Sequence, residues 1–163
     1  MAIKYTCILL IFLLALNPNS TFAQKQKTVL HPISFKVLQD SMQTNPKPIL
    51  VKIYTNWCVY CKMQDKQLQQ SDSLKEIINS HFYYVELDAE SKDTILFNGK
   101  LYSYQSNGLS AGINKLAEVL GKRNGQLNYP VTLILSSTYN ILFYQQGLIF
   151  NKQLLPILQQ VSN

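Results

Sequence analysis

Two cysteines separated by two residues, Cys58 and Cys61, have the clearest potential for chemistry in this sequence. Cys58 follows an apolar segment that is typical of a buried strand, and we expect it to open a helix. Backbone N–H groups and the helix dipole at such a position stabilise a thiolate, the nucleophilic form of cysteine. Cys61, one helical turn later, can attack a mixed disulfide that Cys58 has formed. The spacing therefore predicts a dithiol that exchanges with disulfides.

Other uses of a Cys-x-x-Cys pair can be weighed from the sequence. A zinc site needs two further ligands, and His31 and His81 lack the paired spacing of a zinc finger. Covalent haem attachment needs a histidine directly after the second cysteine, where Lys62 stands, so it is excluded. A purely structural disulfide stays open, although its loop is too short to restrict the unfolded chain much. We expect neither a metal nor an organic cofactor.

The hydrophobic pattern predicts the elements that must position this pair. Residues 49–54 are β-branched and almost continuously apolar, which is typical of a strand buried on both faces. Further strands are predicted at 82–88, 131–135 and 141–144. Helices are predicted at 33–42, from about 61 to 70, around 74–78, from a cap at Ser110 through Ile113 to Gly121, and at 154–161. Strands that alternate with helices in this way predict an α/β architecture with a mixed sheet.

A long segment, residues 89–128, separates the second of these strands from the third. Within it, Asn98-Gly99 stands between two apolar stretches and is a strong signal for a β-hairpin. Tyr102 and Tyr104 alternate and therefore share a face. They either pack over the sheet or line a groove for a partner. The sequence assigns no role to the segment as a whole.

Composition and charge describe a globular domain with a mildly basic surface. The chain has 163 residues, of which 47% are hydrophobic and 15% are charged, and its formal net charge is +6. This length suits one domain and is too short for a multidomain enzyme. The basic residues are scattered, whereas nucleic-acid binding calls for a clustered stripe of Lys and Arg. We therefore expect no nucleic-acid partner and a monomeric protein.

Residues 1–23 have the pattern of a secretory signal peptide. Lys4 precedes an apolar run at 7–16, and small residues two apart precede a cleavage point after Ala23. The apolar run is shorter than the roughly 20 residues that a spanning helix needs. Cys7 stands at the start of this run and not after it, so it is no lipoprotein acceptor. We expect an exported chain with one domain at residues 24–163 and no stable membrane anchor.

The segment at residues 47–62, which reads Lys-Pro-Ile-Leu-Val-Lys-Ile-Tyr-Thr-Asn-Trp-Cys-Val-Tyr-Cys-Lys, resembles the strand and active site of thioredoxin-like proteins. It looks closest to secreted bacterial thioredoxin-related proteins, and it is similar to the C-terminal domain of the membrane-bound disulfide reductase relay. Tyr129-Pro130 before a strand resembles the family's cis-proline, and Gly147 after the next strand resembles a glycine of the family. The resemblance to the thioredoxin superfamily covers about residues 33–161.

This resemblance implies a thioredoxin-like fold, in which helices flank a central mixed β-sheet and the hairpin-containing insertion precedes the cis-proline strand. It also implies that Cys58 is the nucleophile, that Cys61 is the resolving thiol, and that the two form a redox-active disulfide. Trp57 would shield the site, unless it is an ordinary half-buried aromatic residue. Tyr129 would pair through its backbone with an extended substrate. Pro130 would be cis and lie beside the sulfurs, unless it simply begins a strand.

We therefore expect an exported, periplasmic thiol–disulfide oxidoreductase that reduces disulfide bonds in proteins. Its partners would be thiol- or disulfide-containing proteins, with a membrane disulfide reductase as the electron donor. Two alternatives are a disulfide oxidase or isomerase, and a non-catalytic peptide-binding module with a thioredoxin fold. Val59-Tyr60 between the cysteines is typical of neither strong reductants nor strong oxidants. The similarity to the reductase-relay domain is what favours the reductive direction.

Lys52 is the position at which the chain departs most from the thioredoxin pattern, because thioredoxins usually carry a buried acid there. If the family register holds, Lys52 points beneath the cysteine pair. A buried ammonium group has to lose its proton, reach water, or pair with a carboxylate. Glu86 on the neighbouring strand is the candidate partner. A cation here would favour a thiolate, so we expect Lys52 and Glu86 to tune the thiols, unless Lys52 simply extends to the surface.

Overall fold

A computed structural model describes residues 28–108 and 111–163 of the chain. The predicted signal peptide at residues 1–23 lies outside the described residues. Within the described ranges, a four-stranded sheet has the order β2-β1-β7-β8. Strands β1 (Ile49–Tyr54) and β2 (Tyr83–Asp88) are parallel, whereas β7 (Val131–Leu135) is antiparallel to β1. Strand β8 (Ile141–Gln146) pairs antiparallel with β7 and forms one edge of the sheet.

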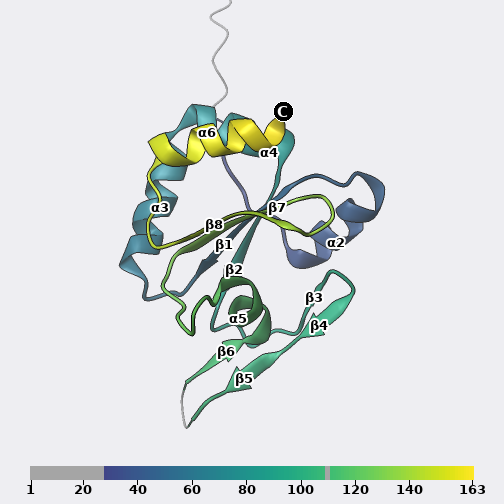
Figure 1. Cartoon of the computed structure of the whole chain (residues 1–163), viewed down its shortest axis with the longest axis vertical. Helices are drawn as coiled ribbons and strands as arrows, with labels where there is room; N and C mark the ends of the chain where they lie inside the picture. Colours follow the sequence, from purple (N-terminus) through teal and green to yellow (C-terminus); the bar gives the residue numbers. More distant parts are fainter. Residues whose placement is uncertain (1–27, 109–110) are drawn as a thin grey trace, which may run out of the picture.

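Helices cover both faces of this sheet, as the α/β prediction requires (Figure 1). One face packs against α3 (Val59–Gln70), α4 (Asp72–His81) and α6 (Asn151–Ser162). The other face packs against α2 (Phe35–Thr44) and α5 (Lys115–Gly121). Each face has its own cluster of fully buried aliphatic side chains. The predicted thioredoxin-like architecture, with a mixed sheet between helices, is confirmed.

Short polar residues fix where the helices begin. The Ser34 side chain accepts a hydrogen bond from the backbone N–H of Val37 at the start of α2, and that of Ser71 accepts one from the N–H of Leu74 in α4. Each bond satisfies one of the N–H groups that a helix leaves without a partner at its first turn. Helix α2 ends at Thr44 with Asn45 as its C-cap, directly before the Pro46-Lys47-Pro48 segment that cannot continue the helix.

The insertion forms two small antiparallel ribbons, one beside α5 and one below it in Figure 1. Strands β3 (Ile95–Phe97) and β4 (Lys100–Tyr102) flank Asn98-Gly99, as predicted, and both turn residues have positive φ angles, of 47° and 72°. Strands β5 (Tyr104–Ser106) and β6 (Gly112–Asn114) form the second ribbon. The half-buried Tyr102 packs against the core of the α2 face.

The start of α5 differs from the prediction in a way that changes the type of element. The expected helix from Ser110 through Ile113 begins only at Lys115, and Ile113 belongs to strand β6. The Asn114 side chain caps α5 by accepting a bond from the N–H of Leu116, whereas Ser110 lies outside the described residues. The apolar spacing of Ile113 is compatible with a helix, but Ile113 pairs with Gln105 in the ribbon. It is extended because β5, which precedes it in the chain, supplies hydrogen-bond partners for the backbone of β6.

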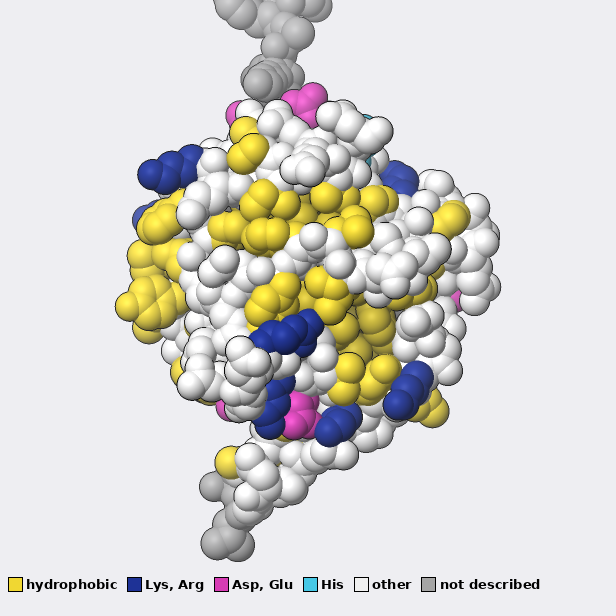
Figure 2. Space-filling model, viewed as in Figure 1, with side chains coloured by type: hydrophobic (Ala, Val, Ile, Leu, Met, Phe, Trp, Pro, Cys, Tyr) yellow, Lys and Arg dark blue, Asp and Glu magenta, His cyan; other side chains and the backbone are white. Residues whose placement is uncertain are grey.

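The sheet edge at β8 is the least covered part of the central sheet. Figure 2 shows apolar side chains gathered in a band over β8 and below α6, with several Lys and Arg side chains lower on the same face. Ile141 and Leu142 are both exposed in this edge strand. The apolar surface here therefore belongs to a strand that β7 pairs on one side only.

Candidate active site

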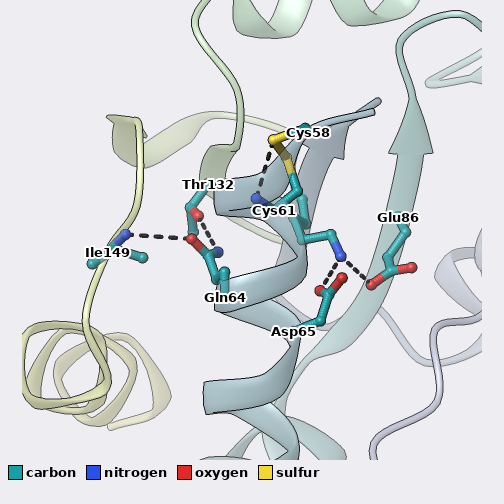
Figure 3. The surroundings of a disulfide bond; sticks show 8 residues. Cys58, Cys61, Gln64, Asp65, Glu86, Thr132 and Ile149 are labelled. Atoms are coloured by element: carbon teal, nitrogen blue, oxygen red, sulfur yellow. Dashed lines mark hydrogen bonds and ion pairs between the residues drawn. A yellow bond between two sulfur atoms is a disulfide. The ribbon is translucent and has the colours of Figure 1, made fainter. Parts of the chain in front are cut away.

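The two cysteines form a disulfide at the junction of β1 and α3. Cys58 is the N-cap of α3, and its Sγ lies 2.05 Å from that of Cys61 (Figure 3). The backbone N–H of Cys61 also donates to the Cys58 Sγ over 3.0 Å. Three residues connect the end of β1 to Cys58, and the N–H of Cys58 donates to the carbonyl of Thr55. Cys58 therefore occupies the helix start that the sequence predicts for it.

The surroundings of the two sulfurs differ. Both residues are buried. Cys58 lines a surface pocket of about 410 Å³, whereas Cys61 is not among the described residues that line this pocket. The rim of this pocket is strongly exposed and apolar, since Trp57 is 64% exposed and Tyr60 is 61% exposed. A partner that reached the disulfide through this pocket would meet Cys58 first.

Trp57 is held in place from two sides. Its indole N–H donates to a carboxylate oxygen of Glu90 over 3.0 Å, and its ring meets the ring of Tyr129 edge-on at 5.9 Å between centroids. Trp57 is thus an exposed residue, and the alternative in which it is an ordinary half-buried aromatic residue is wrong. Glu90 did not emerge from the sequence, because its contact with Trp57 spans 33 residues and depends on where β2 ends.

Tyr129 and Pro130 lie at the entrance to β7. The peptide bond between them is cis, as predicted. Tyr129 lines the same pocket as Cys58, so this part of the predicted site is brought together. Burial raises the pKa of the Tyr129 phenol to about 12, with a further contribution from the negative charge of Glu90 and then of Asp88. The phenol therefore stays neutral at physiological pH.

Lys52 is buried in strand β1, and only 2% of it is exposed. Its ammonium group donates to Glu86 over 2.7 Å, and it forms a second ion pair with Asp65. The Lys52–Glu86 pair is confirmed, and it follows from the register of β1 and β2, which sets the two residues side by side. The alternative in which Lys52 reaches the surface is wrong.

Asp65 and Tyr84 complete the cluster around the buried Lys52, and neither was predicted as a site residue. Asp65 lies four residues after Cys61 and therefore on the same face of α3, a helical spacing that gives a signal for it. Figure 3 shows Asp65 and Glu86 converging on the same ammonium group below the disulfide. The Tyr84 hydroxyl donates to the same oxygen of Glu86. Burial, followed by the charge of Glu86, raises the pKa of Tyr84 well above its ordinary value.

Two further properties of the described residues concern ligands and membranes. Across residues 28–108 and 111–163, no three His, Cys, Asp or Glu side chains are grouped so that they could hold a metal ion. In the same part of the chain, no helix is both long and apolar enough to cross a bilayer.

Comparison with known proteins places the fold and the cysteine segment in context. The sequence profile of the Thioredoxin_7 (thioredoxin-like) family matches residues 38–111. A thioredoxin-fold protein from Helicobacter pylori superposes with a TM-score of 0.58 at 17% identity, over 85% of this chain and 75% of that one. No curated protein matches the chain in sequence.

Two other solved structures share the fold at similarly low identity. DsbH oxidoreductase superposes with a TM-score of 0.52 at 16% identity, over 84% of this chain and 90% of that one. A disulphide isomerase from Xylella fastidiosa Temecula1 superposes with a TM-score of 0.50 at 18% identity, over 78% of this chain and 87% of that one.

Proposed function

We propose that this chain, which shares its fold with thioredoxin-fold proteins and matches the thioredoxin-like family over residues 38–111, is a thiol–disulfide oxidoreductase that reduces disulfide bonds in proteins. The observation that carries this proposal is the Cys58–Cys61 disulfide at the start of α3, with Cys58 in a surface pocket. The helix dipole and the free N–H groups of the first turn favour negative charge at an N-cap sulfur. These features support Cys58 as the attacking thiol and Cys61 as the resolving thiol.

The proposed reaction begins with both cysteines reduced. The Cys58 thiolate attacks one sulfur of a substrate disulfide, which forms a mixed disulfide and releases the other substrate sulfur as a thiolate. Cys61 then gives up its proton and attacks the Cys58 sulfur, which releases the second substrate thiolate. Two electrons pass to the substrate, and the protein ends in the disulfide form. A dithiol of a donor protein, such as a membrane disulfide reductase, would restore the reduced form.

Lys52 and Glu86 tune the thiols in this proposal. The ammonium group of Lys52 offsets the two carboxylates of Asp65 and Glu86, one of which projects from the same helix as the cysteines. Without that ammonium group, two negative charges would face a site that has to hold a thiolate, and the thiol would be favoured. Lys52 thereby keeps the nucleophile available at neutral pH.

Substrate binding in this proposal uses the pocket around Cys58. Trp57 and Tyr129 shape its rim, and the backbone of Tyr129, next to Pro130, pairs with an extended substrate strand. The exposed apolar rim suits a partially unfolded protein, which presents both an extended backbone and apolar side chains. We further propose that a signal peptide at residues 1–23 exports the protein to the periplasm, where disulfide-containing substrates occur.

Reduction of insulin disulfides by the dithiol form tests this function. We expect the wild-type protein to reduce insulin in the presence of a thiol donor, and Cys58→Ser to be inactive. A wild-type protein without activity would favour a peptide-binding module. The reduction potential then tests the direction, because a value near about −270 mV is typical of a reductant and one near about −120 mV is typical of an oxidant.

A further inference from the structure

Gln64 is a buried glutamine on the active-site helix, one turn after Cys61, and only 2% of it is exposed. A side-chain amide buried in this way requires partners for both of its ends. Its Nε2 donates to the Thr132 hydroxyl over 2.9 Å, and its Oε1 accepts from the backbone N–H of Ile149 over 3.3 Å (Figure 3). Gln64 therefore ties α3 to two segments that are 68 and 85 residues away in the sequence.

Both partners connect directly to the segment around Pro130. Thr132 is two residues after Pro130, at the start of β7, and it is itself 1% exposed. On the other side, Gly147 is two residues before Ile149, and its N–H donates to the Pro130 carbonyl over 2.8 Å. Chain and hydrogen bonds together form a closed ring from Pro130 through Thr132, Gln64, Ile149 and Gly147. Gln64 is the member of this ring that belongs to α3.

We propose that Gln64 is a positioning residue, which fixes the Tyr129–Pro130 segment relative to the cysteine pair and so aligns an extended disulfide substrate with Cys58. This inference rests on the proposed function. Glutamine suits the task because its amide both donates and accepts without carrying charge. A carboxylate at this place would lose the donor and bury a negative charge, whereas a methionine of similar length would offer neither bond.

Alignment affects large and small substrates differently. A protein substrate that pairs with the backbone of Tyr129 has its disulfide placed by that segment, so a displaced segment misaligns the reacting sulfurs. A misplacement of about 1 Å between reacting groups can lower a rate by about 100-fold. A small disulfide without a peptide backbone makes no use of the segment and meets Cys58 directly. The ratio of the two rates therefore reports on positioning and not on the amount of folded protein.

The test uses the reduced full-length protein and two probes, insulin and the aromatic disulfide 5,5′-dithiobis(2-nitrobenzoic acid). Thr132→Val removes the hydroxyl at nearly constant volume and leaves the Gln64–Ile149 bond intact. We expect it to lower the insulin rate about tenfold and to leave the rate with the aromatic disulfide within about twofold of wild type. Thr132→Ser, which keeps the hydroxyl, should restore the insulin rate. Gln64→Met should act as Thr132→Val does, with the exposed Gln70→Met as the matched control.

Equal loss with both probes, or no loss with either, in variants with wild-type far-ultraviolet circular dichroism would show that the ring supports only the fold and would overturn the inference. If Thr132→Val does not fold, the ratio measured for Gln64→Met decides in the same way. A wild-type protein that reacts with the aromatic disulfide but never reduces insulin would overturn the proposed function itself, together with this inference. Failure of the inference alone would instead leave wild-type insulin reduction intact.

Discussion

The two sides of helix α3 hold the active-site cysteines in different ways. On one side, Asp65 joins Lys52 and Glu86 in a charged cluster that also includes the Tyr84 hydroxyl. On the other side, the adjacent residue Gln64 makes only neutral hydrogen bonds. Two consecutive residues of one helix thus anchor it to two neighbouring strands, Asp65 to Lys52 of β1 and Gln64 to Thr132 of β7.

The difference between these anchors separates two tasks. Charges act over several ångströms and respond to protonation, so the charged side can change the pKa of a nearby thiol. Neutral hydrogen bonds act only at contact distance, so the neutral side can set geometry but has little effect on titration. We therefore expect variants on the charged side to shift the pKa of the active-site thiols, and variants on the neutral side to leave it unchanged.

Removal of the Lys52 ammonium group should have the largest effect. Lys52→Met leaves two carboxylates close together without their common partner, and we expect it to lower the free energy of unfolding by about 3 kcal/mol. The pKa of the active-site thiols should rise as well, because the two remaining negative charges disfavour a thiolate. Thiolate absorbance followed against pH measures this shift.

Lys66→Met is the matched control for this variant, because Lys66 is an exposed lysine on α3, the helix that follows Cys58. It should change neither quantity appreciably. A thiol pKa that stays at its wild-type value in Lys52→Met would contradict the tuning role and leave Lys52 with a structural role alone.

Loss of the neutral anchor should come second. Gln64→Met leaves the buried N–H of Ile149 without its acceptor, and we expect the free energy of unfolding to fall by about 2 kcal/mol. In contrast to Lys52→Met, the thiol pKa should not move. Chemical denaturation and thiolate absorbance together check this prediction, and a shifted thiol pKa in Gln64→Met would break the distinction between the two sides.

The Tyr84 hydroxyl makes a smaller contribution to the charged side. Tyr84→Phe removes one of the two donors to the Glu86 oxygen, and we expect a loss of about 1 kcal/mol at neutral pH. The pKa of Tyr84 is higher in the folded protein than its ordinary value of 10.0. Its stabilising contribution is therefore complete below pH 10 and declines as the pH rises through the raised pKa.

Denaturation of wild type and Tyr84→Phe at several pH values measures this decline. The difference in stability between the two proteins should shrink above pH 10 and not grow. A difference that is independent of pH across this range would mean that Tyr84 ionises equally easily in the folded and unfolded chains.

The smallest effect on stability should follow from Asp65→Asn. Asp65 is 44% exposed, so solvent screens its ion pair and we expect a loss of about 0.5 kcal/mol. The pKa of the active-site thiols should nevertheless fall, opposite to its rise in Lys52→Met, because one negative charge near Cys61 has been removed. Opposite shifts in these two variants would establish that charge governs the thiols, whereas shifts of the same sign would point to a change in geometry.

Part of the charged cluster around Lys52 could be predicted from the sequence, whereas the neutral hydrogen bonds of Gln64 could not. Strand β1 was predicted with its observed bounds, because its apolar run lies between Pro48 and the polar Thr55. Once two neighbouring parallel strands are placed, their register brings Lys52 beside Glu86. Gln64, by contrast, bonds to Thr132 and Ile149 across long stretches of chain, and no local pattern distinguishes it from the exposed glutamines of the same helix.

The start of helix α5 was predicted wrongly for a different reason: a local helical pattern was present, but tertiary contacts determine the structure there. The spacing of Ile113 and Leu116 is compatible with a helix, yet the N–H of Asn114 donates to the carbonyl of Ala89, and Ile113 pairs within the β5–β6 ribbon. These contacts hold the chain extended up to Asn114, whose side chain then begins the helix.

Covalent trapping of the mixed disulfide tests the central claim, that Cys58 attacks and Cys61 resolves, most directly. Reduced Cys61→Ser protein incubated with insulin should accumulate a covalent complex, because the Cys58 thiolate still attacks but nothing releases the substrate. Mass spectrometry of that complex should place the link at Cys58, and Cys58→Ser should trap no substrate. A complex that forms through Cys61 in Cys58→Ser, with none in Cys61→Ser, would contradict the assignment of the two thiols.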